Sequence, residues 1–159
     1  MKRNQNEAKR RRLALQVWSL ARAQAALPYI GSVMRSLREH RLEAQAQQSR
    51  AEKLARRPGR PDRSAIIALE EAKAAAAKAH DAFETALHEL HSLDIYCLDP
   101  IQGLALIPFV HDKQLAWYVF DLFEADPPRF WRFHTDPLEK RRPLAELEKA
   151  QPDDLTRLA

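Results

Sequence analysis

Apolar residues recur every three or four positions through the long central part of the chain. A first run extends from Ile30 to Leu54, and a second, more strictly spaced run extends from Ala65 to Leu93. Such spacing places one apolar stripe along each of two helices. Between the runs lies Arg57-Pro58-Gly59-Arg60-Pro61, whose prolines and glycine end helices. The pattern therefore predicts two long helices joined as an antiparallel hairpin.

The first long helix is expected to begin at a proline. Leu13–Trp18 alternates weakly, which suits a short strand, and Ser19 is a good N-cap for a short helix over Leu20–Leu27. Pro28 lacks the N–H that a continuing helix needs, but it is favoured at the first position of a new helix. We therefore expect a break at Pro28. The second long helix is expected to follow a cap at Asp62 or Ser64.

After Leu93 the apolar period changes to two, which is typical of strands. Four short aromatic and aliphatic segments are separated by turn residues, and they predict an antiparallel meander. A short helix is expected near the C-terminus, over Leu144–Ala150. The predicted strands are Ile95–Leu98, Leu104–Phe109, Leu115–Asp121 and Arg129–His134.

These elements predict an α+β fold in which a long antiparallel helical hairpin packs at its base against the small β-meander. The length of 159 residues suits one domain. Residues 1–12 hold almost no apolar residue, so we expect a disordered basic tail there. Within the single domain, 13–159, we expect a short strand and helix (13–27), the helical hairpin (28–94), the meander (95–136) and a C-terminal segment (137–159).

Composition narrows the class of protein. The single cysteine, Cys97, rules out an internal disulfide and suits a reducing compartment. No run reaches the roughly 18 apolar residues of a membrane helix, so a cytoplasmic protein without a membrane partner is expected. Only three glycines are present, which argues against glycine-rich nucleotide loops, and we expect no cofactor.

The formal net charge of +4 is concentrated in two basic clusters, residues 1–12 and residues 50–63. Such clusters are candidate contacts for a polyanion, although basic turns and tails are commonly only solvated. The candidate contacts are Lys9, Arg10, Arg11, Arg12, Arg57 and Arg60.

Two further groups of side chains are candidate sites. His88 and His91 share a helix face, with Glu84 one turn away, and are weak candidates for a metal; solvated histidines are the alternative. Position 92 is serine, so the zinc-protease spacing of two histidines four residues apart is absent. His134, Arg141 and Arg142 suit a phosphate or carboxylate, or else the arginines pair with a neighbouring acid.

A length mismatch predicts self-association. Helices of about 27 residues span roughly 40 Å, whereas the strands span about 20 Å, so the sheet covers only one end of the hairpin. We expect the uncovered end to form a homodimer as a four-helix bundle. The expected interface residues are Leu42, Ile66 and Leu69.

Two stretches carry a family resemblance. The first, Trp18–Pro28, has an aromatic residue, a cap, a short helix and a closing Leu-Pro; the second runs from Leu98-Asp99-Pro100 to Arg141-Arg142-Pro143-Leu144. In both, the chain resembles the prokaryotic domain-of-unknown-function family 2203. The resemblance implies the same order of elements and a prokaryotic origin, and it assigns no activity. Asp94 stands where the family usually has a glycine after the second helix.

The sequence thus favours a non-enzymatic interaction or assembly module that binds an unknown protein partner through the hairpin. The alternative is an auxiliary protein held to nucleic acid or another polyanion by the basic tail and the hairpin tip. An enzyme with a site at His134–Arg142 is the third hypothesis, and no nucleophile with a neighbouring base supports it.

Overall fold

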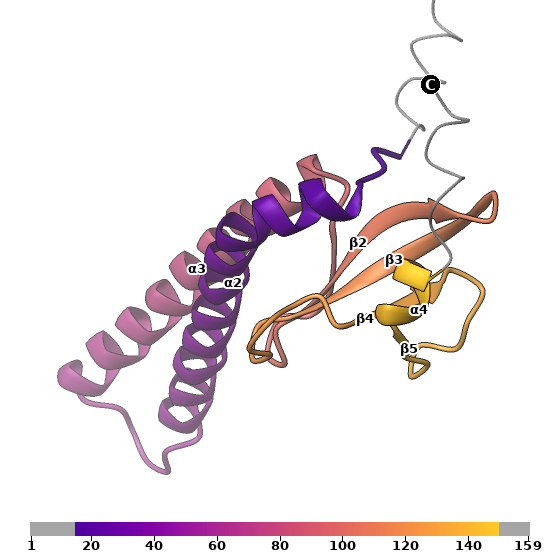
Figure 1. The fold of residues 1–159 in the computed structure, drawn as a ribbon. Helices are drawn as coiled ribbons and strands as arrows, with labels where there is room; N and C mark the ends of the chain where they lie inside the picture. The colour runs from indigo at the N-terminus through magenta and orange to yellow at the C-terminus, as the bar shows by residue number, and fades with distance from the viewer. Residues whose placement is uncertain (1–14, 150–159) are drawn as a thin grey trace, which may run out of the picture.

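The computed structural model describes residues 15–149 and has the predicted α+β architecture. Two long helices lie side by side and cross one end of an antiparallel sheet (Figure 1). The helices are α2 (Leu20–Ala55) and α3 (Arg63–Ser92). The strands are β1 (Tyr96–Asp99), β2 (Leu104–His111), β3 (Gln114–Asp121), β4 (Phe130–Phe133) and β5 (Arg142–Pro143), followed by the short helix α4 (Ala145–Lys149).

Side-chain caps fix the starts of both long helices. The hydroxyl of Ser19 accepts a hydrogen bond from the N–H of Arg22 at 3.1 Å, and the carboxylate of Asp62 accepts one from the N–H of Ala65 at 2.7 Å. Each cap satisfies one of the N–H groups that the first helical turn leaves without a partner. The caps expected at Ser19 and at Asp62 are confirmed.

The expected break at Pro28 is wrong, because α2 continues through this residue without interruption. Pro28 removes the hydrogen bond to the carbonyl of Gln24, but both residues are exposed, so water can bind that carbonyl. The strand expected at Leu13–Trp18 is also wrong over its described residues, Leu15–Trp18, which are irregular. A single backbone hydrogen bond of 2.8 Å joins the N–H of Trp18 to the carbonyl of Pro108.

The sheet has the order β1-β2-β3-β4-β5, and every neighbouring pair is antiparallel. A two-residue turn joins β2 to β3, with positive φ at Asp112 (49°) and Lys113 (59°). Four strands match the predicted meander to within two residues at each end. The fifth strand, β5, was not predicted, and it carries the sheet beyond residue 136. The helix expected at Leu144–Ala150 is α4, although Ala150 lies outside the described residues.

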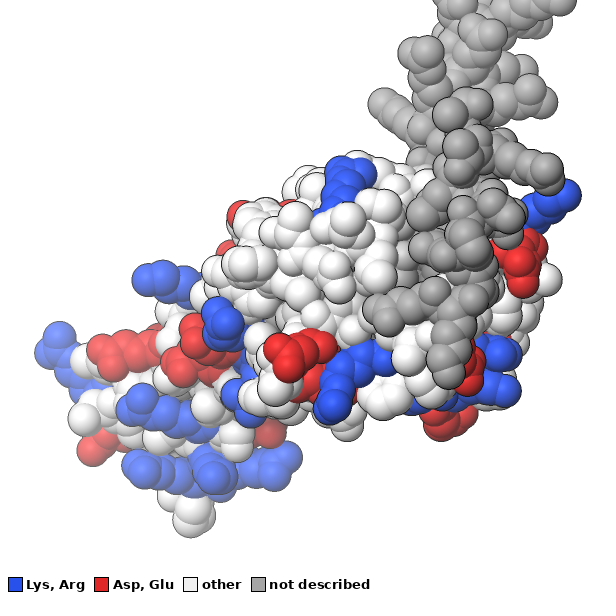
Figure 2. All heavy atoms as spheres, in the orientation of Figure 1, with Lys and Arg blue, Asp and Glu red and all other residues white. Residues whose placement is uncertain are grey.

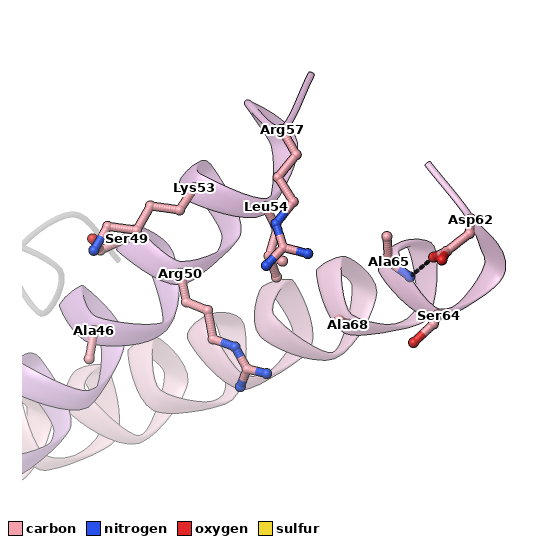
Figure 3. Close-up of a pocket in the computed structure, with 10 residues that line it drawn as sticks. All are labelled: Ala46, Ser49, Arg50, Lys53, Leu54, Arg57, Asp62, Ser64, Ala65 and Ala68. Atoms are coloured by element: carbon pink, nitrogen blue, oxygen red, sulfur yellow. Dashed lines mark hydrogen bonds between the residues drawn. The ribbon is translucent and has the colours of Figure 1, made fainter. Parts of the chain in front are cut away.

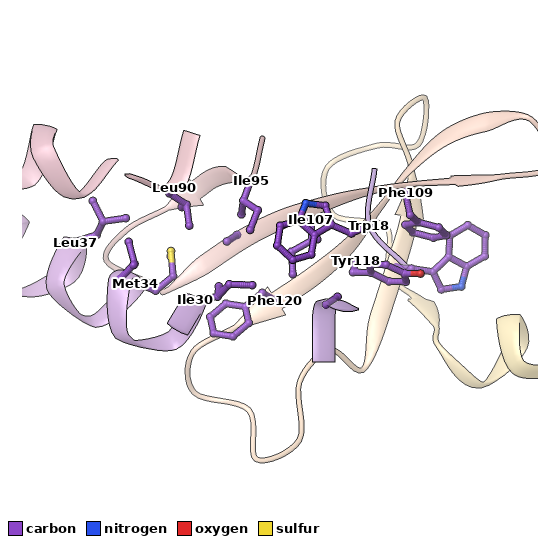
Figure 4. Packing of buried hydrophobic residues seen from close by; sticks show 14 of the residues in the cluster. Trp18, Ile30, Met34, Leu37, Leu90, Ile95, Ile107, Phe109, Tyr118 and Phe120 are labelled. Carbon is purple, nitrogen blue, oxygen red and sulfur yellow. The ribbon is translucent and has the colours of Figure 1, made fainter. Parts of the chain in front are cut away.

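The main core lies between one face of the sheet and the near ends of α2 and α3 (Figure 4). Of the described residues, none between Leu37 and Phe83 belongs to this core. The sheet therefore covers the hairpin only at its base, as the length mismatch predicts. The bulkiest fully buried side chains include Ile30, Met34, Leu37, Leu90, Ile95 and Ile107.

The end of α3 is tied to the segment before α2. Asp94 adopts the left-handed conformation, with φ 57°, as the residue after a helix C-cap commonly does. Its carboxylate accepts a hydrogen bond from the N–H of Gln16 at 2.7 Å. The indole N–H of Trp18 donates to the carbonyl of Leu93 at 3.2 Å. Both bonds hold the two hairpin ends to one another at the sheet.

No helix among residues 15–149 combines the length and the apolar character needed to span a bilayer.

Gly103→Ala should destabilise the base of the fold. Gly103 has φ +72°, and an added Cβ would lie 2.5 Å from the Cβ of Leu122. Gly59 is a matched control, since it also has a positive φ (+91°) but has no atom within 4 Å of an added Cβ. Gly59→Ala should cost about 1 kcal/mol from backbone strain alone, and Gly103→Ala at least about 2 kcal/mol more from overpacking.

Urea denaturation of both variants measures the difference. Equal losses of unfolding free energy in the two variants would contradict the clash at Leu122.

Candidate interaction site

The far part of the hairpin, residues 42–79, is called the arm below. In this region each helix is covered only by the other, and the sheet does not reach them (Figure 1). The contacts between the helices are made by small or half-buried side chains. The arm is therefore a narrow two-helix rod that is open to solvent on most sides. Its inward-facing residues are Ala44, Gln47, Ala51 and Leu54 on α2, and Leu69, Ala72, Ala76 and Ala79 on α3.

The free end of the arm is strongly basic. Lys and Arg side chains gather there in Figure 2. All six cations of residues 50–63 are exposed, and none forms an ion pair with another described residue. Against them stand only Glu52 and Asp62. The cations are Arg50, Lys53, Arg56, Arg57, Arg60 and Arg63.

A cleft of about 700 Å³ opens between the end of α2 and the start of α3. The side chains of Arg50, on α2, and of Arg57, in the loop after it, extend toward α3, whereas Lys53 turns away beside Ser49 (Figure 3). The rest of the lining includes alanines and Leu54, whose small volume leaves the hollow between the helices. Arg50 and Lys53 belong to the basic cluster of residues 50–63 that the sequence singles out, although they are not among the individual contacts named there.

Of the six basic residues of the two clusters that are predicted to contact an anion, only some lie near this cleft. Arg57 lines the cleft and Arg60 is exposed in the loop beside it. The other four candidates, Lys9, Arg10, Arg11 and Arg12, lie outside the described residues.

The three residues of the expected dimer interface differ in exposure. Ile66 is 50% exposed and Leu42 is 38% exposed, whereas Leu69 is half-buried between the helices. Leu42 follows the buried Leu37 by five residues, which rotates its side chain to the side of α2 away from α3. Ile66 lies beside Leu69 on α3, on the flank opposite the cleft residue Ser64.

The candidate metal ligands lie on the outer surface of α3. His88, His91 and Glu84 are all exposed, and the carboxylate of Glu84 lies 3.8 Å from Nε2 of His80. Within residues 15–149, no three His, Cys, Asp or Glu side chains are placed to hold one metal ion. The structure therefore brings no third ligand to the two histidines.

The groups at His134, Arg141 and Arg142 do not converge on one point. Arg142 donates to both carboxylate oxygens of Asp136, at 2.8 and 2.9 Å. Arg141 donates to the carbonyl of Leu138 at 3.1 Å, and Nδ1 of His134 accepts from the indole N–H of Trp117 at 3.1 Å. The guanidinium edge of Arg142 is thus occupied by a neighbouring acid, which is the alternative given above.

Asp136 organises this region. Besides Arg142, it accepts a hydrogen bond from the N–H of Phe133 at 2.9 Å, and its carbonyl accepts one from Arg132. The side-chain hydrogen bond from Arg142, as the largest cause, and the hydrogen bond from the N–H of Phe133 hold the pKa of Asp136 well below its usual range. Arg132 is only 4% exposed, and no pattern in the sequence indicates that this arginine is buried.

Cys97 is half-buried in β1. Burial, with a smaller effect from the charge of Asp99, raises the pKa of its thiol to about 11. At neutral pH the thiol therefore stays protonated, which is the unreactive form.

The chain belongs to the DUF2203 family, described as an uncharacterized conserved protein, whose model matches residues 16–144. The match confirms the resemblance and covers the hairpin, the sheet and the tie between them. No curated protein and no solved structure matches the chain significantly.

Asp136→Asn should lower stability at neutral pH by removing the charged acceptor of Arg142. Because the folded pKa is depressed, the contribution of this carboxylate is fully present above the unfolded pKa of about 3.9. It is lost progressively as pH falls below that value, so the difference from wild type should shrink there.

Urea denaturation between neutral pH and about pH 3 measures this difference. Asp81→Asn, which removes an exposed carboxylate from α3, is the control and should have little effect. A difference that stays constant as pH falls below the unfolded pKa would contradict the role of the ion pair.

Proposed function

We propose that this DUF2203 protein is a non-enzymatic interaction module that presents its arm to a macromolecular partner. The observation that supports this most directly is that residues 38–82, all described, contribute nothing to the main core. A segment of this length is not needed to fold the base. Its regular helical structure, carried well beyond the sheet, suits a surface that reaches a partner.

The composition of the arm also favours a partner. Most helical stability in proteins comes from tertiary packing, and a seam made largely of alanine buries little apolar area. Two large apolar side chains, Ile66 and Ile67, remain 50% and 47% exposed on α3. Contact with a partner would bury them and stabilise the arm.

The base holds the arm in a fixed direction. The guanidinium of Arg38 donates to the carbonyl of Ile101, in the turn between β1 and β2, at 3.0 Å. The guanidinium of Arg41 lies over the ring of Phe83, 5.4 Å from its centroid. These contacts join α2 to the sheet and to α3 where the arm begins. A rigid mount reduces the conformational entropy lost when a partner binds.

Replacing residues 45–75 by a short loop should leave the base folded and abolish partner binding. All residues of the main core remain in this variant. Circular dichroism should show a cooperative transition for the base. Affinity purification from the native host, followed by identification of bound protein and nucleic acid, should show partners only with the intact chain. Val110→Ser, at an exposed position of β2 in the base, is the control.

Retention of the same partners by the shortened variant would contradict the proposal and would direct attention to the sheet.

A second copy of this chain is one partner that the exposed apolar residues favour. Sedimentation equilibrium should then give twice the chain mass of 18.3 kDa. Ile66→Lys should shift the protein toward monomer, whereas Ile66→Val should not. If the wild-type protein stays monomeric at concentrations on the order of tens of micromolar, the arm does not bind a second copy and its partner is a different molecule.

A further inference from the structure

The cleft at the end of the arm is lined by three cations. Arg50 and Lys53 lie in the last two turns of α2, and Arg57 lies in the loop just after the C-cap, Arg56. Two of the three, Arg50 and Arg57, extend across the cleft toward α3 (Figure 3). Arg56, Arg60 and Arg63 are also exposed and add positive charge at the free end.

The nearby acids do not neutralise this charge. The carboxylate of Asp62 lines the cleft, but it is engaged as the N-cap of α3 through its 2.7 Å hydrogen bond to Ala65. Glu52 follows Arg50 by two residues, so it points to the far side of α2. The cleft therefore presents guanidinium groups whose hydrogen-bond donors are available to an anion.

The geometry suits a row of anionic groups better than a single one. Arg50 lies in the last two turns of α2 and Arg57 in the loop that follows the helix, so the two guanidinium groups reach the cleft from separate points of the chain. Guanidinium groups bind phosphate in a bidentate manner, and a phosphodiester chain repeats that group along its length. The lining offers only alanines and Leu54 as apolar contacts, so an acidic peptide would find no deep anchor for its side chains.

The end of the arm also lacks the groups that read bases. Residues 45–75 contain no Phe, Tyr or Trp, so no base can stack there on an aromatic ring. Binding through phosphates alone carries little sequence preference.

We propose that this cleft binds the phosphodiester backbone of nucleic acid through Arg50 and Arg57, with Lys53 adding charge beside them. The proposal rests on the proposed function, that the arm is the interaction surface, and it names the chemistry of the partner. DNA and RNA share this phosphodiester chemistry, so both are used as probes in the test.

Fluorescence anisotropy of the full chain tests the proposal, with labelled single-stranded DNA, single-stranded RNA and duplex DNA of about 20 nucleotides, from about 50 to about 200 mM salt. The expected result is binding to all three that weakens steeply with salt. The double variant Arg50→Gln/Arg57→Gln should bind at least about tenfold more weakly at low salt. On duplex DNA its salt slope should fall by about 1.8, since each lost phosphate contact contributes about 0.9.

Two control variants keep the result specific. Arg35→Gln/Lys78→Gln removes the same charge from exposed positions nearer the base and should keep the wild-type slope. Neutralising Lys9, Arg10, Arg11 and Arg12 separates any contribution of the basic tail. Circular dichroism of each variant confirms that the helices are intact.

The proposal is overturned if the full chain binds no probe at low salt, or if the cleft variant and the Arg35/Lys78 variant behave alike. It is overturned in favour of an acidic protein partner if polyglutamate displaces nucleic acid at equal charge concentration. If the nucleic-acid proposal is overturned but the variant shortened at residues 45–75 still loses its partners, the arm remains the interaction surface and only its assignment to nucleic acid is wrong.

Discussion

The structure depends on a mismatch between two lengths. Helix α2 has 36 residues and is about 54 Å long, whereas strands β2 and β3 have eight residues each and span about 27 Å. A sheet of this size can bury only part of the hairpin, and the apolar residues follow that limit. Bulky side chains such as Ile30 and Leu90 lie where the sheet covers them, and alanine replaces them where only the partner helix remains. The arm and its basic end are what the sheet leaves uncovered.

The base is joined more firmly than the arm. Trp18 and Asp94 tie the chain before α2 to the end of α3, while Asp136 joins β4 to β5 through Arg142. The contacts of Trp18 and Asp94 link segments that are distant in sequence, so they close the base into one cooperative unit. The arm has a narrow seam and exposed charges instead. Local opening should therefore begin at its free end, where order imposed by a partner would have the largest effect.

Much of the fold was predictable because the spacing of apolar residues along the chain differs between helices and strands. The change of period after Leu93 located the sheet, and Pro58, Gly59 and Pro61 located the hairpin loop. The misses have physical causes. Pro28 is tolerated because the carbonyl it deprives of a partner is exposed, which no local pattern reveals. Strand β5 has two residues, too few for alternation, and it forms only because β4 offers it an edge. The burial of Arg132 depends on the turn after β4, which brings the carbonyl of Asp136 to its guanidinium group.

The placement of the aromatic residues determines which part of the molecule a fluorescence measurement of unfolding follows. All three tryptophans, Trp18, Trp117 and Trp131, lie in the base, and residues 45–75 contain no aromatic side chain. Intrinsic tryptophan fluorescence therefore does not report unfolding of the outer arm, whereas far-ultraviolet circular dichroism is dominated by the two long helices. The two signals weigh different parts of the same molecule, and their midpoints need not coincide. A single-domain chain can thus depart from two-state unfolding, because fluorescence follows the part covered by the sheet and dichroism also follows the arm beyond it.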